Sequence, residues 1–258
     1  MINYSQDERQ YHIGLTKEDI GEYVILPGDP GRCEKIAKYF DDAKFVASNR
    51  EFTTYTGYLN GTKVSVVSTG IGGPSASICM EELVELGAHT FIRTGTCGGM
   101  QEDVLSGNIA IATGCIRQEG TTREYAPIEF PAVPHIDCVN ALIQACKNLG
   151  LSYNVGVSQS KDAYYGQHRP ETLPNHVDLQ TKWDAWLQLG AIASEMEGAA
   201  LCMVAQYRRV RFGACFLVMA NQTRAAKGLD NPICYDIDRS IKTAVEALRI
   251  LIDEDKKK

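Results

Sequence analysis

The sequence predicts an α/β fold in which helices flank a central β-sheet. Short β-rich runs alternate with amphipathic segments along the chain, with no internal repeat and no low-complexity segment. With 258 residues, of which 44% are hydrophobic, the chain can bury the core of one large domain. Two domains of about 130 residues would also fit the length, but no linker rich in proline or serine divides the chain. We therefore expect one domain over residues 1–258.

The expected elements are placed by hydrophobic period, turn residues and helix ends. Asn60-Gly61 is a turn dipeptide that predicts a hairpin over residues 55–70, and Gly150 closes an amphipathic helix that begins near residue 137. The remaining strands are expected at residues 23–30, 89–96, 108–120, 153–160 and 211–221. The remaining helices are expected at residues 32–40, from about Ser75 to Leu86, at residues 181–190 and 195–210, and from about Asp238 to Ile252.

The net charge of −6 argues against one class of partner. A nucleic-acid-binding protein that relies on a broad basic face would carry a positive balance, so no nucleic-acid partner is expected. A small anionic substrate needs only a few local cations, and the global charge does not exclude it.

The chain carries no sign of export or of a membrane span. Residues 1–14 are polar and lack the apolar region of a secretory signal, and no apolar run approaches the roughly 20 residues that cross a bilayer. The nine cysteines are odd in number and form no C-x-x-C pair. We expect a cytoplasmic protein without a membrane partner, whose thiols are reduced and mostly buried.

Three strands are expected to end in loops rich in glycine, serine, threonine and arginine, at residues 27–32, 68–75 and 93–99. Ligands of α/β sheets gather at the carboxyl ends of strands, where glycine lets backbone N–H groups approach an anion and arginine adds paired donors. Arg32, Arg93 and Thr96 are therefore candidate phosphate ligands. Turn geometry and solvated arginines would explain each loop on its own. The chain has neither G-x-x-x-x-G-K-[ST] nor G-x-G-x-x-G, so nucleoside triphosphates and dinucleotides are not expected.

The segment SEMEGAA at residues 194–200 is expected to join a strand end to a helix start. Glu195 and Glu197 stand two positions apart there, and Met196 between them can form an apolar wall. Acidic groups at a helix N-terminus can simply interact with the helix dipole. Alternatively, a carboxylate at this junction accepts hydrogen bonds from the vicinal hydroxyls of a sugar.

The segment KDAYYGQHR at residues 161–169 combines side chains that can complement a pyrimidine. Gln167 offers an amide donor and acceptor, Arg169 a fork of donors, and Tyr164 and Tyr165 flat faces. The imide edge of a pyrimidine presents an acceptor, a donor and an acceptor, which the amide and guanidinium groups match. A surface loop anchored by its tyrosines is the competing explanation.

Several motifs together resemble a known family. HIGLTKEDI, PGDPGR, NREFTTY, STGIGGPS, RTGTCGG, EFPAV, YYGQHR and EMEGAA occur in the order and approximate spacing of the uridine-cleaving branch of the nucleoside phosphorylases, from about His12 to the C-terminal helix. The resemblance implies a mixed, partly barrel-like sheet and a pentosyltransferase of pyrimidine salvage. It would cleave uridine, with deoxyuridine as a second candidate, reversibly to uracil and ribose 1-phosphate. Inorganic phosphate is then the co-substrate, and no organic cofactor is expected.

The resemblance also implies roles for individual residues. Catalytic roles fall to Arg93, Arg169 and Glu197. Phosphate would be bound by Gly28, Arg32, Arg93 and Thr96, with Arg50 reaching in from a neighbouring subunit. Ribose would be bound by Met196 and Glu197, with His12 crossing the same interface, and uracil by Tyr164, Gln167 and Arg169. The expected homo-oligomer is a hexamer built from dimers with shared active sites, and Glu51, Ile71 and Ser75 match positions that hold potassium between paired subunits in some relatives.

Two departures from the family pattern concern the base. Where uridine enzymes carry an arginine after an asparagine, this chain has Gln222, with Arg224 close by. Purine-cleaving relatives carry a serine–aspartate pair at the same place, and the absence of an acid from Asn221-Gln222 favours a pyrimidine. The open alternatives are a purine nucleoside phosphorylase, a nucleosidase that uses water, and a catalytically silent nucleoside-binding protein on the same scaffold.

Overall fold

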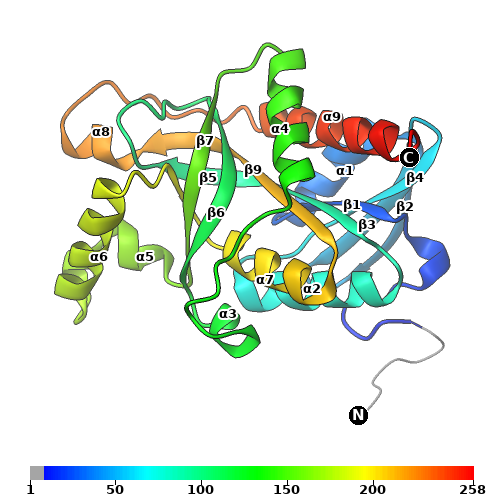
Figure 1. Ribbon diagram of the computed structural model, residues 1–258, viewed down its shortest axis with the longest axis horizontal. Helices are drawn as coiled ribbons and strands as arrows, with labels where there is room; N and C mark the ends of the chain where they lie inside the picture. Colours follow the sequence, from blue (N-terminus) through cyan, green and yellow to red (C-terminus); the bar gives the residue numbers. More distant parts are fainter. Residues whose placement is uncertain (1–8) are drawn as a thin grey trace.

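A nine-stranded mixed sheet runs through the computed structural model, which describes residues 9–258 (Figure 1). The polar N-terminal segment, in which no secretory signal is expected, lies mostly outside these residues. The strand order is β2-β3-β4-β1-β5-β8-β7-β6-β9. The strands are β1 (Tyr23–Pro27), β2 (Asp41–Asn49), β3 (Phe52–Leu59), β4 (Thr62–Val67), β5 (Thr90–Gly99), β6 (Ile109–Gln118), β7 (Tyr153–Lys161), β8 (Ala193–Glu195) and β9 (Arg211–Asn221).

Part of the sheet closes on itself. β5 pairs in parallel with β9 as well as with β1, so that β5, β8, β7, β6 and β9 form a barrel. The strands β1 to β4 extend from this barrel as an open sheet. The expected α/β fold with a mixed, partly barrel-like sheet is confirmed.

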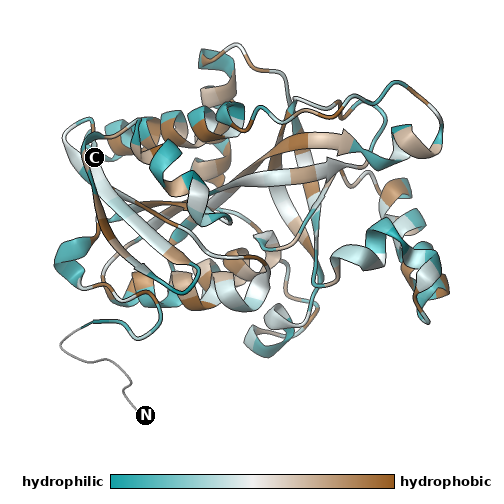
Figure 2. Cartoon of the chain, turned by 180° about the vertical axis from the view of Figure 1, so that it is seen from behind, coloured by the Kyte–Doolittle hydropathy of each residue, from teal (hydrophilic) through white to brown (hydrophobic). Residues whose placement is uncertain are grey.

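Helices cover both faces of the sheet (Figure 1). α2 (Gly73–Glu85) and α7 (Gly198–Arg208) bury their apolar residues in one core, and α1 (Cys33–Ala37), α4 (Ile136–Asn148) and α9 (Asp238–Asp255) bury theirs in a second core. Figure 2 shows α9 alternating between teal and brown, as expected of a helix with one buried face. The other α-helices of the described chain are α3 (Thr121–Tyr125), α5 (Tyr164–His168), α6 (His176–Gln188) and α8 (Gln222–Ala226).

Local sequence signals placed several elements correctly. Asn60 and Gly61 have φ angles of 49° and 73°, the left-handed pair that a tight turn between β3 and β4 requires. Gly150, with φ of 63°, follows the end of α4 as predicted. Eight of the nine cysteines are buried, as expected. No helix within residues 9–258 is long and apolar enough to cross a membrane.

The prediction of a loop at residues 93–99 is wrong. β5 continues through these residues to Gly99 and pairs there with β8 and β9. Small residues allow the strand to bend into the barrel, and its register shifts between Cys97 and Gly98. Four further elements, β2, α3, α5 and α8, were not predicted. β2 lacks the alternation of buried and exposed residues that marks a strand, and each of the three helices has only 5 residues, too few to show a helical period.

Candidate functional site

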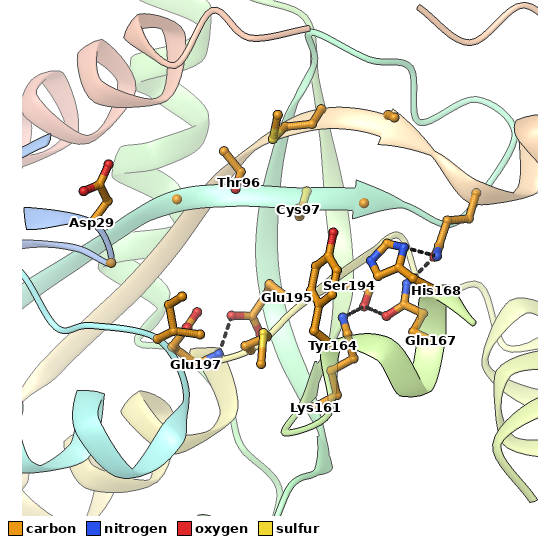
Figure 3. Close-up of a pocket in the computed structure, with 18 of the residues that line it drawn as sticks. Asp29, Thr96, Cys97, Lys161, Tyr164, Gln167, His168, Ser194, Glu195 and Glu197 are labelled. Carbon is orange, nitrogen blue, oxygen red and sulfur yellow. Dashed lines mark hydrogen bonds between the residues drawn. The ribbon is translucent and has the colours of Figure 1, made fainter. Parts of the chain in front are cut away.

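A cavity of about 950 Å³ opens beside β5 (Figure 3). Much of the remaining wall comes from the end of β1, the β8–α7 junction, α5 and the β9–α8 junction, with further residues from the β4–α2 loop and the segment that follows α8. Most of the predicted site residues line it, namely Gly28, Arg32, Glu51, Ile71, Arg93, Thr96, Tyr164, Gln167, Met196 and Glu197. Four others, His12, Arg50, Ser75 and Arg169, do not line it.

A buried ion pair joins two walls of the cavity. Nη2 of Arg93 on β5 donates to Oε2 of Glu197 at 2.7 Å, and the two residues are only 4% and 6% exposed. Oε1 of Glu197 accepts the N–H of Gly72 at 2.7 Å, and Nη1 of Arg93 donates to Oγ1 of Thr69 at 2.8 Å. The buried Nε of Arg93 has no hydrogen-bond partner among residues 9–258. The Nε–H of this arginine is therefore left for a ligand.

Gly28 and Arg32 add to the positive end of the cavity. A Cβ at Gly28 would stand 3.1 Å from Nη2 of Arg93 and 3.3 Å from the Gly70 carbonyl oxygen, so glycine allows the backbone to come this near. Nε of Arg32 lies 3.8 Å from Oδ2 of Asp29. Burial lowers the pKa of Arg32, the charge of Asp29 opposes this shift, and the charge of Arg93 adds to it. An anion between the two guanidinium groups would relieve their repulsion.

The two glutamates of the β8–α7 junction differ in their contacts. Oε2 of Glu195 accepts the N–H groups of Glu197 and Gly198 at 2.8 Å each, and its Oε1 accepts the hydroxyl of Ser160. Burial raises the pKa of Glu195, and the neighbouring Glu197 raises it further. Glu195 thus serves the helix N-terminus, while each oxygen of Glu197 keeps one further acceptor position.

Amides and aromatic rings line the other end of the cavity (Figure 3). Oε1 of Gln167 accepts from the hydroxyl of Ser194, and Nε2 of Gln167 donates to Oε1 of Gln222. The rings of Tyr164 and His168 lie 4.1 Å apart at an angle of 31°. This end offers hydrogen-bonding edges and flat apolar faces to a planar ligand.

Lys161 stands in the wall beside this amide group. It is 6% exposed, and its Nζ donates to Oγ of Ser194 at 2.6 Å. Burial lowers the pKa of Lys161 to about 8, although Glu195 and Glu197 oppose the shift. The side chain is therefore mostly protonated near neutral pH. Burial lowers the pKa of His168, and the charge of Lys161 lowers it further.

Two arginines near the predicted base site turn away from the cavity. Cζ of the exposed Arg169 lies 4.8 Å from the centroid of the Tyr165 ring. Arg224 donates to the carbonyl oxygens of Asp230 at 2.8 Å and Glu102 at 3.0 Å. In this conformation Arg224 does not take the place of the arginine that the resemblance led us to expect at the position of Gln222.

His12 and Arg50 gather on a separate surface. Nδ1 of His12 lies 2.5 Å from Oε1 of Glu82, whose carboxylate also accepts the N–H of Ile13 at 2.9 Å. The ring of Tyr11 has its centroid 4.9 Å from that of His12 and 5.8 Å from Cζ of Arg50. The two residues that were expected to cross an interface therefore lie together, outside the cavity of their own chain.

Glu51 and Ser75 meet at the cavity rim. Oγ of Ser75 donates to Oε1 of Glu51 at 2.7 Å, and this hydrogen bond, together with the charges of Arg50 and His12, lowers the pKa of Glu51. Ile71 nearby is 77% exposed. Within residues 9–258 no three histidine, cysteine, aspartate or glutamate side chains come together as a metal site. A cation at Glu51 would need hydroxyl and carbonyl oxygens as well.

Comparison with known proteins identifies the family. A model of the phosphorylase superfamily matches residues 22–254. The chain belongs to this superfamily.

Its relatives include enzymes for different bases. The uridine phosphorylase of Treponema pallidum is 55% identical over 252 residues, 98% of this chain and 97% of its own length. The uridine phosphorylase of Escherichia coli is 39% identical over 247 residues, 94% of this chain and 98% of its own length. The guanosine phosphorylase of Halorubrum lacusprofundi is 36% identical over 247 residues, 95% of this chain and 97% of its own length.

Several residues at or near the site of this superfamily member could not be predicted from the sequence. Lys161, His168 and Ser194 line the cavity, and Glu82 holds His12. The first three lie in the segments at residues 161–169 and 194–200, but only tertiary contacts distinguish them from exposed polar residues. Glu82 had no distinguishing local signal, because Glu81 and Glu85 in the same expected helix are also acidic.

Removing the carboxylate of Glu197 is expected to destabilise the protein. Glu197→Ala leaves the charge of Arg93 buried without its partner and Gly72 without its acceptor, and breaking a buried pair in this way costs about 3–5 kcal/mol. Urea denaturation measures the change. Glu102→Ala, which removes an exposed carboxylate paired with Lys227, is the control and should shift the midpoint little. Equal midpoints for both variants would contradict the importance of the buried pair.

Proposed function

We propose that this chain is a uridine phosphorylase, a pentosyltransferase that converts uridine and phosphate reversibly into uracil and ribose 1-phosphate. The observation that carries the proposal is the buried pair of Arg93 and Glu197, which joins a cationic end of the cavity to an amide-lined end. Relatives named uridine phosphorylase, at 55% and 39% identity, support it. Its proposed place is pyrimidine salvage in the cytoplasm.

Phosphate would occupy the cationic end. The buried Nε of Arg93 has no hydrogen-bond partner within residues 9–258, which supports an anionic ligand here, and Arg32 adds a second fixed charge. Thr96 lines the same cavity with a hydroxyl group, and Gly28 admits the ligand close to the backbone. Planar guanidinium forks suit phosphate oxygens better than single ammonium groups do.

Ribose and uracil would extend from the phosphate toward the amides. Glu197 would accept hydrogen bonds from the 2′- and 3′-hydroxyls, with Met196 against the sugar ring. Gln167 would read the uracil edge, and the ring of Tyr164 would pack on the base. Arg169 would leave the ring of Tyr165 and join Gln167 when the base is bound.

The proposed reaction needs no covalent enzyme intermediate. As the C1′–N1 bond breaks, its electron pair moves onto uracil and the ribose gains oxocarbenium character. A phosphate oxygen forms the new C1′–O bond, and the uracil anion takes up the proton that hydrogen phosphate releases as it becomes the ester, with water as the carrier. Gln167 and Arg169 would stabilise the charge on the departing base more strongly than they stabilise neutral uridine, which lowers the barrier.

A second copy of the chain would complete each site. His12 and Arg50 lie together away from their own cavity, with His12 oriented by Glu82. In a two-fold dimer these residues would enter the neighbouring cavity, where His12 would reach the ribose 5′-hydroxyl and Arg50 the phosphate. Three such dimers would form the proposed hexamer.

Potassium would bind at the two-fold contact. Glu51 and Ser75 offer a carboxylate and a hydroxyl that already lie 2.7 Å apart, and the backbone at Ile71 offers a carbonyl. Such oxygen ligands suit a hard cation, and two copies together would supply a fuller shell than one. The bound ion would reduce the repulsion between facing carboxylates.

A purine substrate is the nearest rival, because one relative is named guanosine phosphorylase. Asn221 is fully buried and donates to the carbonyl oxygens of Gln101 at 2.7 Å and Val104 at 2.8 Å, while its own Oδ1 accepts the N–H of Arg224. The side chain of Asn221 therefore holds the neighbouring loops together. It has no acidic group that could protonate a purine. The base end therefore favours a pyrimidine.

The proposal predicts phosphate-dependent release of uracil from uridine. Chromatography of reactions with and without phosphate would follow the products, with deoxyuridine, thymidine, inosine and adenosine as parallel substrates. Faster cleavage of inosine or adenosine would identify a purine enzyme. Release without phosphate would identify a nucleosidase, and binding without cleavage a silent nucleoside-binding protein.

Arg169→Ala is expected to lower kcat on uridine about 10²–10³-fold, the usual loss of one preorganised donor. The thermal midpoint should hardly change, because the side chain is exposed on Tyr165. Arg123→Ala, at an exposed position on α3, is the matched control. A wild-type kcat for Arg169→Ala would mean that this arginine stays on Tyr165 and takes no part in the reaction.

Shared sites predict complementation between inactive variants. Arg50→Ala and Arg93→Ala oligomers should each be nearly inactive, since each lacks a phosphate ligand. After subunit exchange, mixed oligomers should regain activity because some sites combine an intact Arg50 with an intact Arg93. Mass spectrometry would establish the exchange, and exchanged oligomers without activity would argue that each subunit works alone.

A further inference from the structure

The cavity holds a buried lysine for which the proposed mechanism has no role. Nζ of Lys161 donates to Oγ of Ser194 at 2.6 Å, and Ser194 is itself only 3% exposed. Ser194 contacts Oε1 of Gln167, whose Nε2 contacts Oε1 of Gln222 (Figure 3). One chain of hydrogen bonds thus runs from an ammonium group to the amide that is proposed to read uracil.

The ammonium group sets the direction of this chain. A protonated lysine has three donors and no acceptor, so the oxygen of Ser194 must accept from it. The single hydroxyl hydrogen of Ser194 is then free for a carboxamide oxygen, and Gln167 and Gln159 both present Oε1 to it. When Ser194 holds the oxygen of Gln167, the N–H groups of this amide point toward Gln222 and toward a ligand.

We propose that Lys161 is a positioning residue of the base site, which acts through Ser194 to turn an N–H group of Gln167 toward a carbonyl oxygen of the departing uracil. This inference rests on the proposed function and deepens it. The opposite orientation of the amide would present an oxygen to the negative charge that develops on the base and would raise the barrier. Lys161 therefore selects the orientation that favours bond cleavage.

Lys161 also supplies positive charge at an end of the cavity that otherwise has little of it. Gln222 in the lining is neutral, and Arg169 lies on Tyr165 outside the cavity. The titratable groups that face Lys161 come from four elements. They are Cys97 on β5, His168 on α5, Glu195 on β8 and Glu197 at the start of α7. The two carboxylates favour the charged form of the lysine, and the lysine in turn favours a neutral His168.

The protonated lysine is the form that orients Ser194. Because burial lowers the pKa of Lys161 to about 8, the hydrogen-bond chain is intact below that pH and is lost as the pH rises through it. A neutral amine can accept the hydroxyl hydrogen of Ser194, and Gln167 then loses the donor to its oxygen. Activity that depends on this chain should decline over the same range.

The test compares kcat and KM for uridine and for 5-fluorouridine, whose base leaves as a more stable anion. Lys161→Met should lower kcat on uridine about 10- to 100-fold, below the 10²–10³ of a direct donor, with little change in KM. The loss should be smaller on 5-fluorouridine, because its base needs less help to leave. Lys182→Met, on α6 with Nζ 2.6 Å from Asp178 and outside the cavity, is the matched control and should retain wild-type kcat.

A double-mutant cycle tests whether Lys161 acts through Ser194. Ser194→Ala should resemble Lys161→Met, and the double variant should lose no more than the poorer single variant. Lys161→Arg keeps the charge at all working pH values, so its kcat should lack the decline near pH 8. If Lys161→Met does not fold, the pH profile of Lys161→Arg decides, and a decline like that of the wild type contradicts the inference.

Other outcomes also overturn the inference. Equal losses on uridine and 5-fluorouridine would show a purely structural role, and a double variant with the product of the two single losses would show independent residues. If the wild type is active and the variants keep its kcat, the role of Lys161 is refuted but the proposed function is not. A wild type that releases no uracil in the presence of phosphate would refute the proposed function, and this inference with it.

Discussion

Two opposite charges held out of water, on Arg93 and Glu197, organise the surrounding loops. Burying such a pair costs desolvation free energy, and the cost is met only when the remaining donors and acceptors are also paired. Thr69 and Gly72, both in the loop that follows β4, supply those partners at 2.8 Å and 2.7 Å. The pair therefore ties β5, the β4–α2 loop and the start of α7 into one unit, and leaves the buried Nε of Arg93 without a partner among the described residues.

The sequence carried enough information for the fold class and for much of the cavity wall. Alternating strand and helix patterns, the turn at Asn60-Gly61 and the helix end at Gly150 depend on neighbouring residues, so they could be read locally. Clusters of glycine and arginine beside expected strand ends pointed to Arg32 and Arg93 for the same reason. The course of β5 beyond residue 96 could not be read in this way, because small residues suit both a loop and a strand that bends into a barrel.

Three parts of the site required tertiary structure. Glu195 and Glu197 look alike in the sequence, and only their partners separate a helix cap from a residue of the ion pair. Lys161 reads as an ordinary surface lysine until β7 carries it into the barrel wall. Arg169 has the right chemistry for a base reader, yet its conformation depends on the competing ring of Tyr165. Sequence spacing contains none of these long-range choices.

β5 belongs both to the closed barrel and to the open sheet, and it carries Arg93, Thr96 and Gly98 along one side of the cavity. The distance between the cationic end and the amide-lined end of the cavity is therefore set by the backbone of this one strand. Side chains around it can be exchanged without altering that spacing. An insertion or deletion of even one residue between Arg93 and Gly98 would change that spacing and shift the two ends relative to each other.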